Sequence, residues 1–293
     1  MKPASFKYLA PRSEDELLGL LAEHGGDARL LAGGQSLVPM MNFRVVSPAV
    51  ILDINRIPSI AFIKKDAGNI EVGALARHAS LEDSAQVRAE LPIACEAIGY
   101  LAHRAVRNRG TMGGSLALAY PNAELPLLFT VLGAEILLRS TRGDRRLPIG
   151  EFISGPLNTV LEEDEFIHSA RLPVPASSTG MAFAEVSRRH GDFALAAAAA
   201  IVDLDGNGAV RMVQAAISGG EGAPARAGGA EAALLGEMPR AGFMESVARA
   251  AIEEIEVEGD AQFPAGYRRL LLTTTLQRAL ETAAQRAEQR CVN

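Results

Sequence analysis

The chain opens with apolar residues at helical spacing, which predicts an amphipathic helix over residues 13–26. Ser13 and Glu16 form a capping box at its start, and a glycine pair follows its end. A short apolar run at 28–34 then predicts a buried strand that leads into a second glycine pair. Two further elements are expected, a short helix at 36–43 capped by Ser36 and a strand at 49–54.

Residues 60–140 alternate short strands with apolar helices. The periodicity predicts strands at 60–64, 69–73 and 134–140, and helices at 90–106 and 124–133. The charged segment RGDRR at 142–146 is typical of a solvated polar turn.

A change of composition at RLPVPASSTG, residues 171–180, marks the best domain boundary, because proline, serine and glycine gather there. Beyond it, the alanines of 193–220 favour helix by propensity. A DGNG turn between two apolar runs is nevertheless a hairpin signal, so we expect a strand–turn–strand. Helices at 228–256 and 264–290 follow. The layout indicates an α+β N-terminal part and a smaller α+β C-terminal domain.

The totals exclude several classes of protein. A chain of 293 residues accommodates about two domains of roughly 150 residues each. Its net charge of -6 argues against a general nucleic-acid binder, which needs a basic face. The two cysteines, Cys95 and Cys291, form no C-x-x-C pair, so a zinc or iron–sulfur site on this chain is not expected. Because the sequence has no signal-peptide core and no apolar run long enough to span a bilayer, we expect a cytoplasmic protein.

Two short segments with the same chemistry lie about eighty residues apart, AGGQSL at 32–37 and TMGGSL at 111–116. Glycines let the backbone approach a ligand closely and adopt positive φ, and the start of a helix favours an anion. Two such turns could hold the two phosphates of one diphosphate; two ordinary tight turns are the alternative. The residues concerned are Ala32, Gly33, Gly34, Gln35, Ser36, Leu37, Thr111, Gly113, Gly114 and Ser115.

Charged residues flank the second glycine turn. Arg104, Arg107 and Arg109 precede it and could balance the charge of a diphosphate, or lie solvated along the surface. Glu124 follows it, where a carboxylate could bind ribose hydroxyls or simply favour the first turn of a helix. The sequence has no G-x-G-x-x-G after a strand and no P-loop, which disfavours the commonest nucleotide-binding folds.

No side chains show the spacing of an acid–base pair, a nucleophile or a metal site. The five histidines form no H-x-x-x-H or H-E-x-x-H motif, and there is no G-x-S-x-G. Residues 203–214 approach a calcium loop, but Gln214 replaces its bidentate glutamate. SRRHGD at 187–192 is interpreted as a polar turn. The residues alone therefore predict a protein that binds a diphosphate ligand and leaves the chemistry to it.

Taken in order, AGGQSL, RNRGTMGGSLALAYPNAELP and EVSRRHGDFALAA resemble the FAD-binding medium subunit of molybdenum hydroxylases. That family includes aerobic carbon monoxide dehydrogenase and the subunit form of xanthine dehydrogenase. The resemblance covers nearly the whole chain and implies an α+β fold of two domains. The first, at 1–175, is an FAD-binding domain of the vanillyl-alcohol-oxidase (PCMH) type, with subdomains at about 1–56 and 57–175. The second, at 180–293, is a smaller α+β domain of the carbon monoxide dehydrogenase flavoprotein type.

The resemblance also implies roles for particular residues. In the family both glycine turns, here Ala32 to Leu37 and Thr111 to Ser115, hold the diphosphate of FAD. Glu124 matches an acidic position toward the adenosine, and Leu161 and Phe193 match positions near the isoalloxazine. No metal ligand and no catalytic side chain is implied on this chain.

The chain departs from the family at two positions. Family members often read GGSLAHADP where this chain reads GGSLALAYP, so Leu118 replaces a histidine and Tyr120 replaces an aspartate. Both changes remove a polar group, which puts the adenine or ribose contacts and the FAD affinity in question.

The implied function is that of the flavoprotein subunit in an oxidoreductase complex. A partner large subunit with a molybdenum–pterin cofactor oxidises the substrate, and a small subunit with two 2Fe–2S clusters passes the electrons on. FAD on this chain then hands them to an external acceptor, within an expected dimer of heterotrimers. The alternatives are a regulatory module that binds nucleotides, an FAD-free scaffold subunit, and a stand-alone flavin oxidase, for which we find no substrate base.

Overall fold

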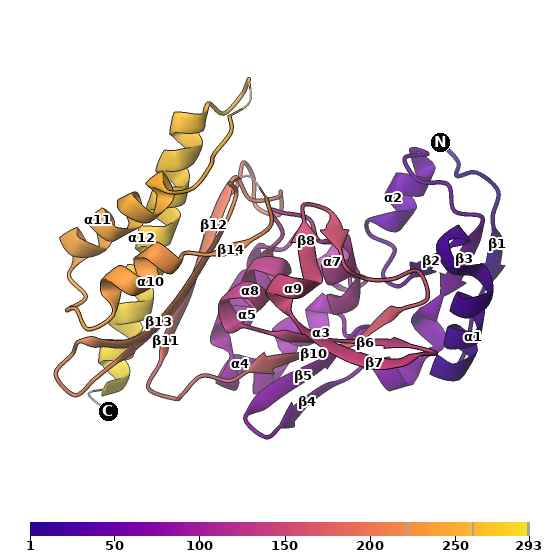
Figure 1. Ribbon diagram of the computed structural model, residues 1–293, viewed down its shortest axis with the longest axis horizontal. Coiled ribbons are helices and arrows are strands. Elements are labelled where there is room, and N and C mark those ends of the chain that lie inside the picture. The colour runs from indigo at the N-terminus through magenta and orange to yellow at the C-terminus, as the bar shows by residue number, and fades with distance from the viewer. Residues whose placement is uncertain (221, 260, 292–293) are drawn as a thin grey trace.

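The computed structural model describes residues 1–220, 222–259 and 261–291. Three units follow one another along the long axis of the molecule in chain order, from the N-terminal unit to the long C-terminal helix (Figure 1). They are built on a three-stranded, a five-stranded and a four-stranded sheet. The mixture of helices and strands in every unit confirms the predicted α+β class.

The N-terminal unit contains a parallel sheet with the strand order β1-β3-β2. Ser13 caps its first helix as predicted, since the hydroxyl accepts a hydrogen bond from the Glu16 amide at 3.2 Å. The predicted strand at 28–34 ends at Leu31, which leaves both following glycines to the turn. The elements are β1 (Lys7–Leu9), α1 (Glu14–His24), η1 (Gly25–Asp27), β2 (Ala28–Leu31), α2 (Leu37–Asn42), β3 (Val50–Asp53), η2 (Ile54–Arg56) and η3 (Pro58–Ile60).

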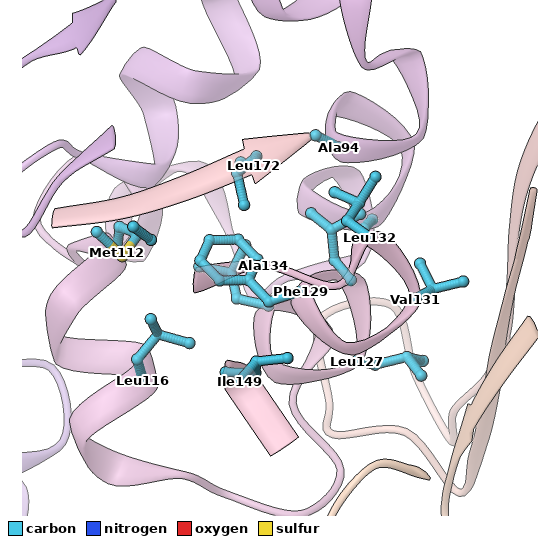
Figure 2. Close-up of a cluster of buried hydrophobic side chains, with 14 of the residues drawn as sticks. Ala94, Met112, Leu116, Leu127, Phe129, Val131, Leu132, Ala134, Ile149 and Leu172 are labelled. Atoms are coloured by element: carbon cyan, nitrogen blue, oxygen red, sulfur yellow. The ribbon is translucent and has the colours of Figure 1, made fainter. Parts of the chain in front are cut away.

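The middle unit contains an antiparallel sheet with the order β4-β5-β10-β6-β7. Helix α8 is buried along its whole length, because it packs against both this sheet and the C-terminal sheet. Figure 2 shows Phe129 of α8 inside the core, with Leu172, Met112 and Ile149 arranged around it. The elements are β4 (Ile63–Asp66), β5 (Asn69–Gly73), α3 (His78–Asp83), α4 (Ala85–Glu90), α5 (Pro92–Tyr100), α6 (Arg104–Arg107), α7 (Met112–Leu118), α8 (Glu124–Leu132), β6 (Glu135–Ser140), β7 (Gly143–Pro148), α9 (Ile149–Phe152), β8 (Ile153–Gly155), β9 (Asn158–Thr159) and β10 (Phe166–Pro173).

The single helix predicted at 90–106 is wrong, because the chain breaks after α5. Ala102 takes a positive φ of 44°, and α6 begins only at Arg104. The guanidinium of Arg107 stabilises the break, since its Nη1 donates to the carbonyls of Leu101 and Ala102 at 2.9 Å each. A side chain from beyond the break thus satisfies two carbonyls that a continuous helix would have paired internally.

The polar turn predicted at 142–146 is also wrong, because most of it belongs to the edge strand β7. Its charged side chains are paired with neighbours rather than merely solvated. Arg139 binds Asp144 at 2.8 Å, and Arg145 binds the buried carboxylate of Glu165 at 2.7 Å. A strand at the edge of a sheet tolerates this composition, since charged side chains there discourage pairing with other chains.

The C-terminal unit confirms the predicted hairpin, in which β12 and β13 pair antiparallel within the sheet order β11-β12-β13-β14. Small residues line this sheet where the long helix α12 lies across it. A Cβ on Gly180 would approach within 2.5 Å of the Ala287 amide nitrogen, so the helix and β11 are in direct backbone contact. The elements are β11 (Gly180–Val186), β12 (Ala196–Leu204), β13 (Val210–Ser218), β14 (Ala225–Arg226), α10 (Gly228–Leu234), α11 (Ala241–Glu253) and α12 (Ala265–Cys291). Within the described parts of the chain, none of the helices combines the length and the apolar character that a membrane span requires.

Candidate functional site

A cavity of about 410 Å³ lies between segments of all three units. The turn after β2 and helix α2 supply one part of its wall, and helix α7 with the turn before it supplies another. The loop between β11 and β12 contributes Gly191 and Phe193. The volume falls within the range of about 300–1,000 Å³ that is usual for ligand and cofactor sites.

The cavity brings together most of the residues that the sequence indicated. Both glycine turns and the acidic and aromatic candidates contribute to its wall; these are Ala32, Gly33, Gly34, Gln35, Ser36, Leu37, Thr111, Gly114, Ser115, Glu124 and Phe193. Two candidates do not line it. Gly113 faces β5 instead, and Leu161 is partly buried against the large hydrophobic core of the middle unit.

The two glycine turns touch each other directly. A Cβ on Gly33 would lie 2.8 Å from the carbonyl carbon of Arg109 and 2.9 Å from the Cα of Gly110, closer than real Cβ contacts come. Gly34 has a φ of 74°, a conformation that other residues rarely adopt. The first turn therefore requires glycine at both positions. Gly33 leaves room for the backbone of Arg109 and Gly110, and Gly34 adopts the positive φ.

The two turns differ in how they begin their helices. Thr111 caps α7, and its hydroxyl accepts from the Gly114 amide at 3.2 Å. Gly113 donates its amide to the Ala74 carbonyl at 2.9 Å, so it anchors α7 to the end of β5. Ser36, in contrast, makes no capping bond from its side chain, and that prediction is wrong. The reason is its backbone, which is already helical, whereas a capping residue is extended.

A buried histidine lies in the wall beside the second turn. His78 is only 4% exposed, and its Nε2 lies 2.9 Å from the Thr111 carbonyl and 3.0 Å from the Ser115 hydroxyl. Burial lowers its pKa to about 4, and the positive charges of Arg107 and Arg77 act in the same direction. The imidazole is therefore neutral at physiological pH.

The arginines before the second turn do not line the cavity. Arg107 is buried and pairs with Glu82 through its Nε at 2.9 Å, and Arg104 pairs with Glu82 and Asp83. Of the two possibilities left open for these arginines, direct contact with a diphosphate therefore does not apply to Arg104 and Arg107, because acidic groups of α3 already hold them. Arg29 of β2 does line the cavity, and its Nη1 donates to the backbone carbonyls of Gly26 and Ala28.

Two acidic side chains are buried where the middle and C-terminal units meet. Glu124 begins α8 and is 3% exposed, and its burial raises its pKa to about 7. Glu185 lies on β11, where burial raises its pKa to about 8 and repulsion from Glu124 adds to the effect. Neither oxygen of Glu185 has a hydrogen-bond partner among the described residues. The pair therefore retains protons at a pH where an ordinary glutamate is ionised.

An aromatic pair lies beside the cavity where the sequence departs from its family. The rings of Tyr120 and Phe193 lie 4.0 Å apart between centroids, at an angle of 30°. Phe193 lines the cavity and is 53% exposed, and Leu118 lines it as well. The wall is thus apolar at Leu118, one of the two positions where the sequence departs from the pattern it resembles.

Sequence reasoning missed several residues of the wall, above all Arg29, His78 and Gly191. His78 carried no motif, and Arg29 lay within an apparently ordinary strand. Gly191 belongs to SRRHGD, which forms a turn as predicted but also reaches the cavity. The described residues contain no group of three or more His, Cys, Asp or Glu placed to hold a metal ion.

Comparison with known proteins assigns both halves of the chain. Residues 4–175 match the FAD binding domain in molybdopterin dehydrogenase, and residues 181–283 match the CO dehydrogenase flavoprotein C-terminal domain. The 6-hydroxypseudooxynicotine dehydrogenase complex subunit alpha of Paenarthrobacter nicotinovorans is 39% identical over 97% of each chain.

Solved structures agree over almost the full length. A chain of quinoline 2-oxidoreductase from Pseudomonas putida 86 superposes with a TM-score of 0.94 at 35% identity, covering 98% of this chain and 99% of its own. A chain of carbon monoxide dehydrogenase from Hydrogenophaga pseudoflava gives 0.94 at 37% identity, with the same coverage. The chain therefore belongs to the FAD-binding medium subunits of the molybdenum hydroxylases, the family of carbon monoxide dehydrogenase and xanthine dehydrogenase.

Proposed function

We propose that this chain is the electron-transferring flavoprotein subunit of a molybdenum-containing hydroxylase or dehydrogenase. When bound in the cavity, FAD supplies an acceptor for electrons from partner 2Fe–2S clusters and a donor to an external acceptor. The substrate is oxidised on a large subunit that holds the molybdenum–pterin cofactor, and a small subunit holds the two clusters. The complex is a dimer of such heterotrimers.

The residues of the cavity fit a diphosphate cofactor. The backbone at Gly33 lies against that of Arg109 and Gly110, directly before Thr111, and both glycine segments line the cavity, which leaves main-chain amides and small hydroxyls to face the phosphates. Arg29 contributes positive charge to the same wall. This electrostatic attraction orients a dianionic ligand and does not require any side chain to react with it.

We use the remaining wall residues to propose where the two ends of the cofactor lie. We place Glu124 toward the adenosine, where burial raises the pKa of its carboxyl group to about 7, so that its protonated form can donate as well as accept hydrogen bonds. Phe193 approaches the isoalloxazine, supported from behind by Tyr120. Leu161 and Gly113 act indirectly, since both pack behind the wall.

The observation that supports the proposal best is the direct contact between the two glycine turns. Segments about eighty residues apart meet at Gly33 and Gly110, and both line one cavity. A pair of unrelated surface turns would not require a backbone approach that excludes even a methyl group.

The test has two stages, which separate cofactor binding from electron transfer. First, the visible spectrum of the purified chain is recorded and any released nucleotide is identified; we expect close to one FAD per chain. A chain that stays colourless and takes up no added FAD would favour a scaffold or regulatory role instead.

The second stage adds the co-expressed iron–sulfur subunit, reduced beforehand under anaerobic conditions. We expect the flavin absorbance of the chain to decrease, and to recover when an external acceptor is added. Free FAD in place of the chain is the control for unassisted reduction. A chain that binds FAD but is not reduced by the partner would refute the electron relay and leave the cofactor assignment intact.

A further inference from the structure

His78 is placed to act on the second glycine turn rather than to fill space. It begins α3, and its own backbone amide donates to the Gly110 carbonyl at 3.1 Å. Its ring reaches back to the same turn, where Nε2 lies within hydrogen-bond distance of Thr111 and Ser115. One residue therefore contacts the beginning, the cap and the first helical turn of this segment.

The contacts determine which ring nitrogen carries the proton. The Thr111 carbonyl can only accept a hydrogen bond, so Nε2 at 2.9 Å must donate. Nδ1 is then the unprotonated nitrogen, because burial lowers the pKa to about 4 and keeps the ring neutral. Nδ1 has no hydrogen-bond partner among the described residues, and a Cβ on Gly110 would lie only 2.7 Å from it.

This tautomer fixes the role of the Ser115 hydroxyl. A protonated Nε2 cannot accept from Ser115 at 3.0 Å, so its one hydrogen is shared between the Thr111 carbonyl and the serine oxygen, and the hydroxyl hydrogen must point elsewhere. Among the described residues no other partner contacts that hydroxyl, and Ser115 lines the cavity. The hydrogen is therefore available to an acceptor inside the cavity.

We propose that His78 is a positioning residue that directs the Ser115 hydroxyl into the cavity as a donor to a phosphate oxygen of the bound dinucleotide. The proposal rests on the proposed cofactor site. His78 lies outside both glycine motifs. By donating to the oxygen of Ser115, it leaves the serine hydroxyl to donate its hydrogen to the ligand. The imidazole itself does not contact the ligand in this arrangement.

A double-mutant cycle tests this coupling. FAD affinity is measured by quenching of flavin fluorescence on the flavin-depleted full chain, for wild type, Ser115→Ala, His78→Leu and the double variant. We expect each single variant to bind FAD roughly 10- to 100-fold more weakly, the range for one hydrogen bond to a charged group. The double variant should bind no more weakly than Ser115→Ala, because His78 acts only through Ser115.

Two further variants separate positioning from structural support. His78→Gln places an amide donor near the Nε2 position and should retain most of the affinity. His168→Leu removes a half-buried histidine that does not line the cavity, so its FAD affinity should be unchanged. If His78→Leu fails to fold, Ser115→Ala and His78→Gln still decide the matter.

An independent readout needs no FAD. Long-range proton–nitrogen NMR of the flavin-free chain should report His78 as the Nε2–H tautomer, and the proton should not titrate down to pH 5. An Nδ1–H tautomer would overturn the proposal, as would additive effects in the double variant. Failure of the wild type to bind FAD would instead refute the proposed function, so the two failures are distinguishable.

Discussion

The contact between the glycine turns predicts that Gly33→Ala separates two segments that must stay together. The new methyl group would lie 2.9 Å from the Gly110 Cα, whereas ordinary contact begins near 3.4 Å. The turns would thus have to part by at least half an ångström, and more at the Arg109 carbonyl. That carbonyl is not free to retreat, because Arg77 donates a hydrogen bond to it.

The energetic cost of Gly33→Ala can be taken from the effect of adding a methyl group to other close-packed protein interiors. Forcing a methyl group into a filled space typically costs about 1–3 kcal/mol. If the free chain relaxes by parting the turns and FAD binding must bring them together again, the whole cost appears as an FAD affinity lowered about 5- to 150-fold. If the turns stay in contact in the free chain, the same energy is lost from the free energy of unfolding.

Two assays divide these cases: FAD binding by fluorescence quenching, and urea unfolding of the flavin-free chain. Gly19→Ala is the matched control, since Gly19 lies inside α1 with nothing within 4 Å of the added Cβ. That variant should be more stable by about 0.5–1 kcal/mol and bind FAD normally. Unchanged affinity and unchanged stability in Gly33→Ala would refute the claim that the turns are in obligatory contact.

Three other substitutions test the supporting structure. Arg107→Leu leaves the carbonyls of Leu101 and Ala102 without their donor and Glu82 with Arg104 alone, and should lower the free energy of unfolding by about 1–3 kcal/mol in urea titrations; an unchanged free energy of unfolding would contradict the role assigned to it. Gly180→Ala places a methyl group 2.5 Å from the Ala287 amide nitrogen, and should lower the melting temperature by detaching α12 from β11. In the flavin-free chain, stability should fall as pH rises from about 4.5 to about 8, because folded Glu185 keeps a proton that the unfolded chain releases; Glu185→Gln should flatten that dependence in unfolding titrations across the range.

The sequence predicted those parts of the fold and the site that are determined by a few neighbouring residues. A glycine pair close before Ser-Leu indicates the start of a helix where the backbone stays bare, so both cavity-lining segments were identifiable from a few letters each. The alanine-rich hairpin was predictable for the same reason, since DGNG constrains its own backbone. Here the turn signal prevailed over the helix propensity of alanine, because β12 gains partners on both sides.

The residues whose roles the sequence did not reveal interact with partners that are far away along the chain. Arg107 stands four positions before Thr111, where the second glycine turn begins, yet its charge is held by Glu82, twenty-five positions earlier. His78 precedes Ser115 by thirty-seven positions and carries no motif. Neither pairing has a periodic signature, because each depends on how α3 packs beside α6 and α7 rather than on any local preference.

The two departures noted in the sequence, Leu118 and Tyr120, lie outside the glycine turns that we propose to hold the diphosphate. Leu118 lines the cavity, and Tyr120 packs its ring on Phe193. Such an aromatic pair contributes about 0.5–1.5 kcal/mol beyond the area it buries, although Phe193 stays 53% exposed. The pair and Leu118 thus give this side of the cavity an apolar, aromatic character. Because both glycine turns and the His78–Ser115 contact lie outside this change, the binding of the diphosphate and the environment of the rings can vary independently in this chain.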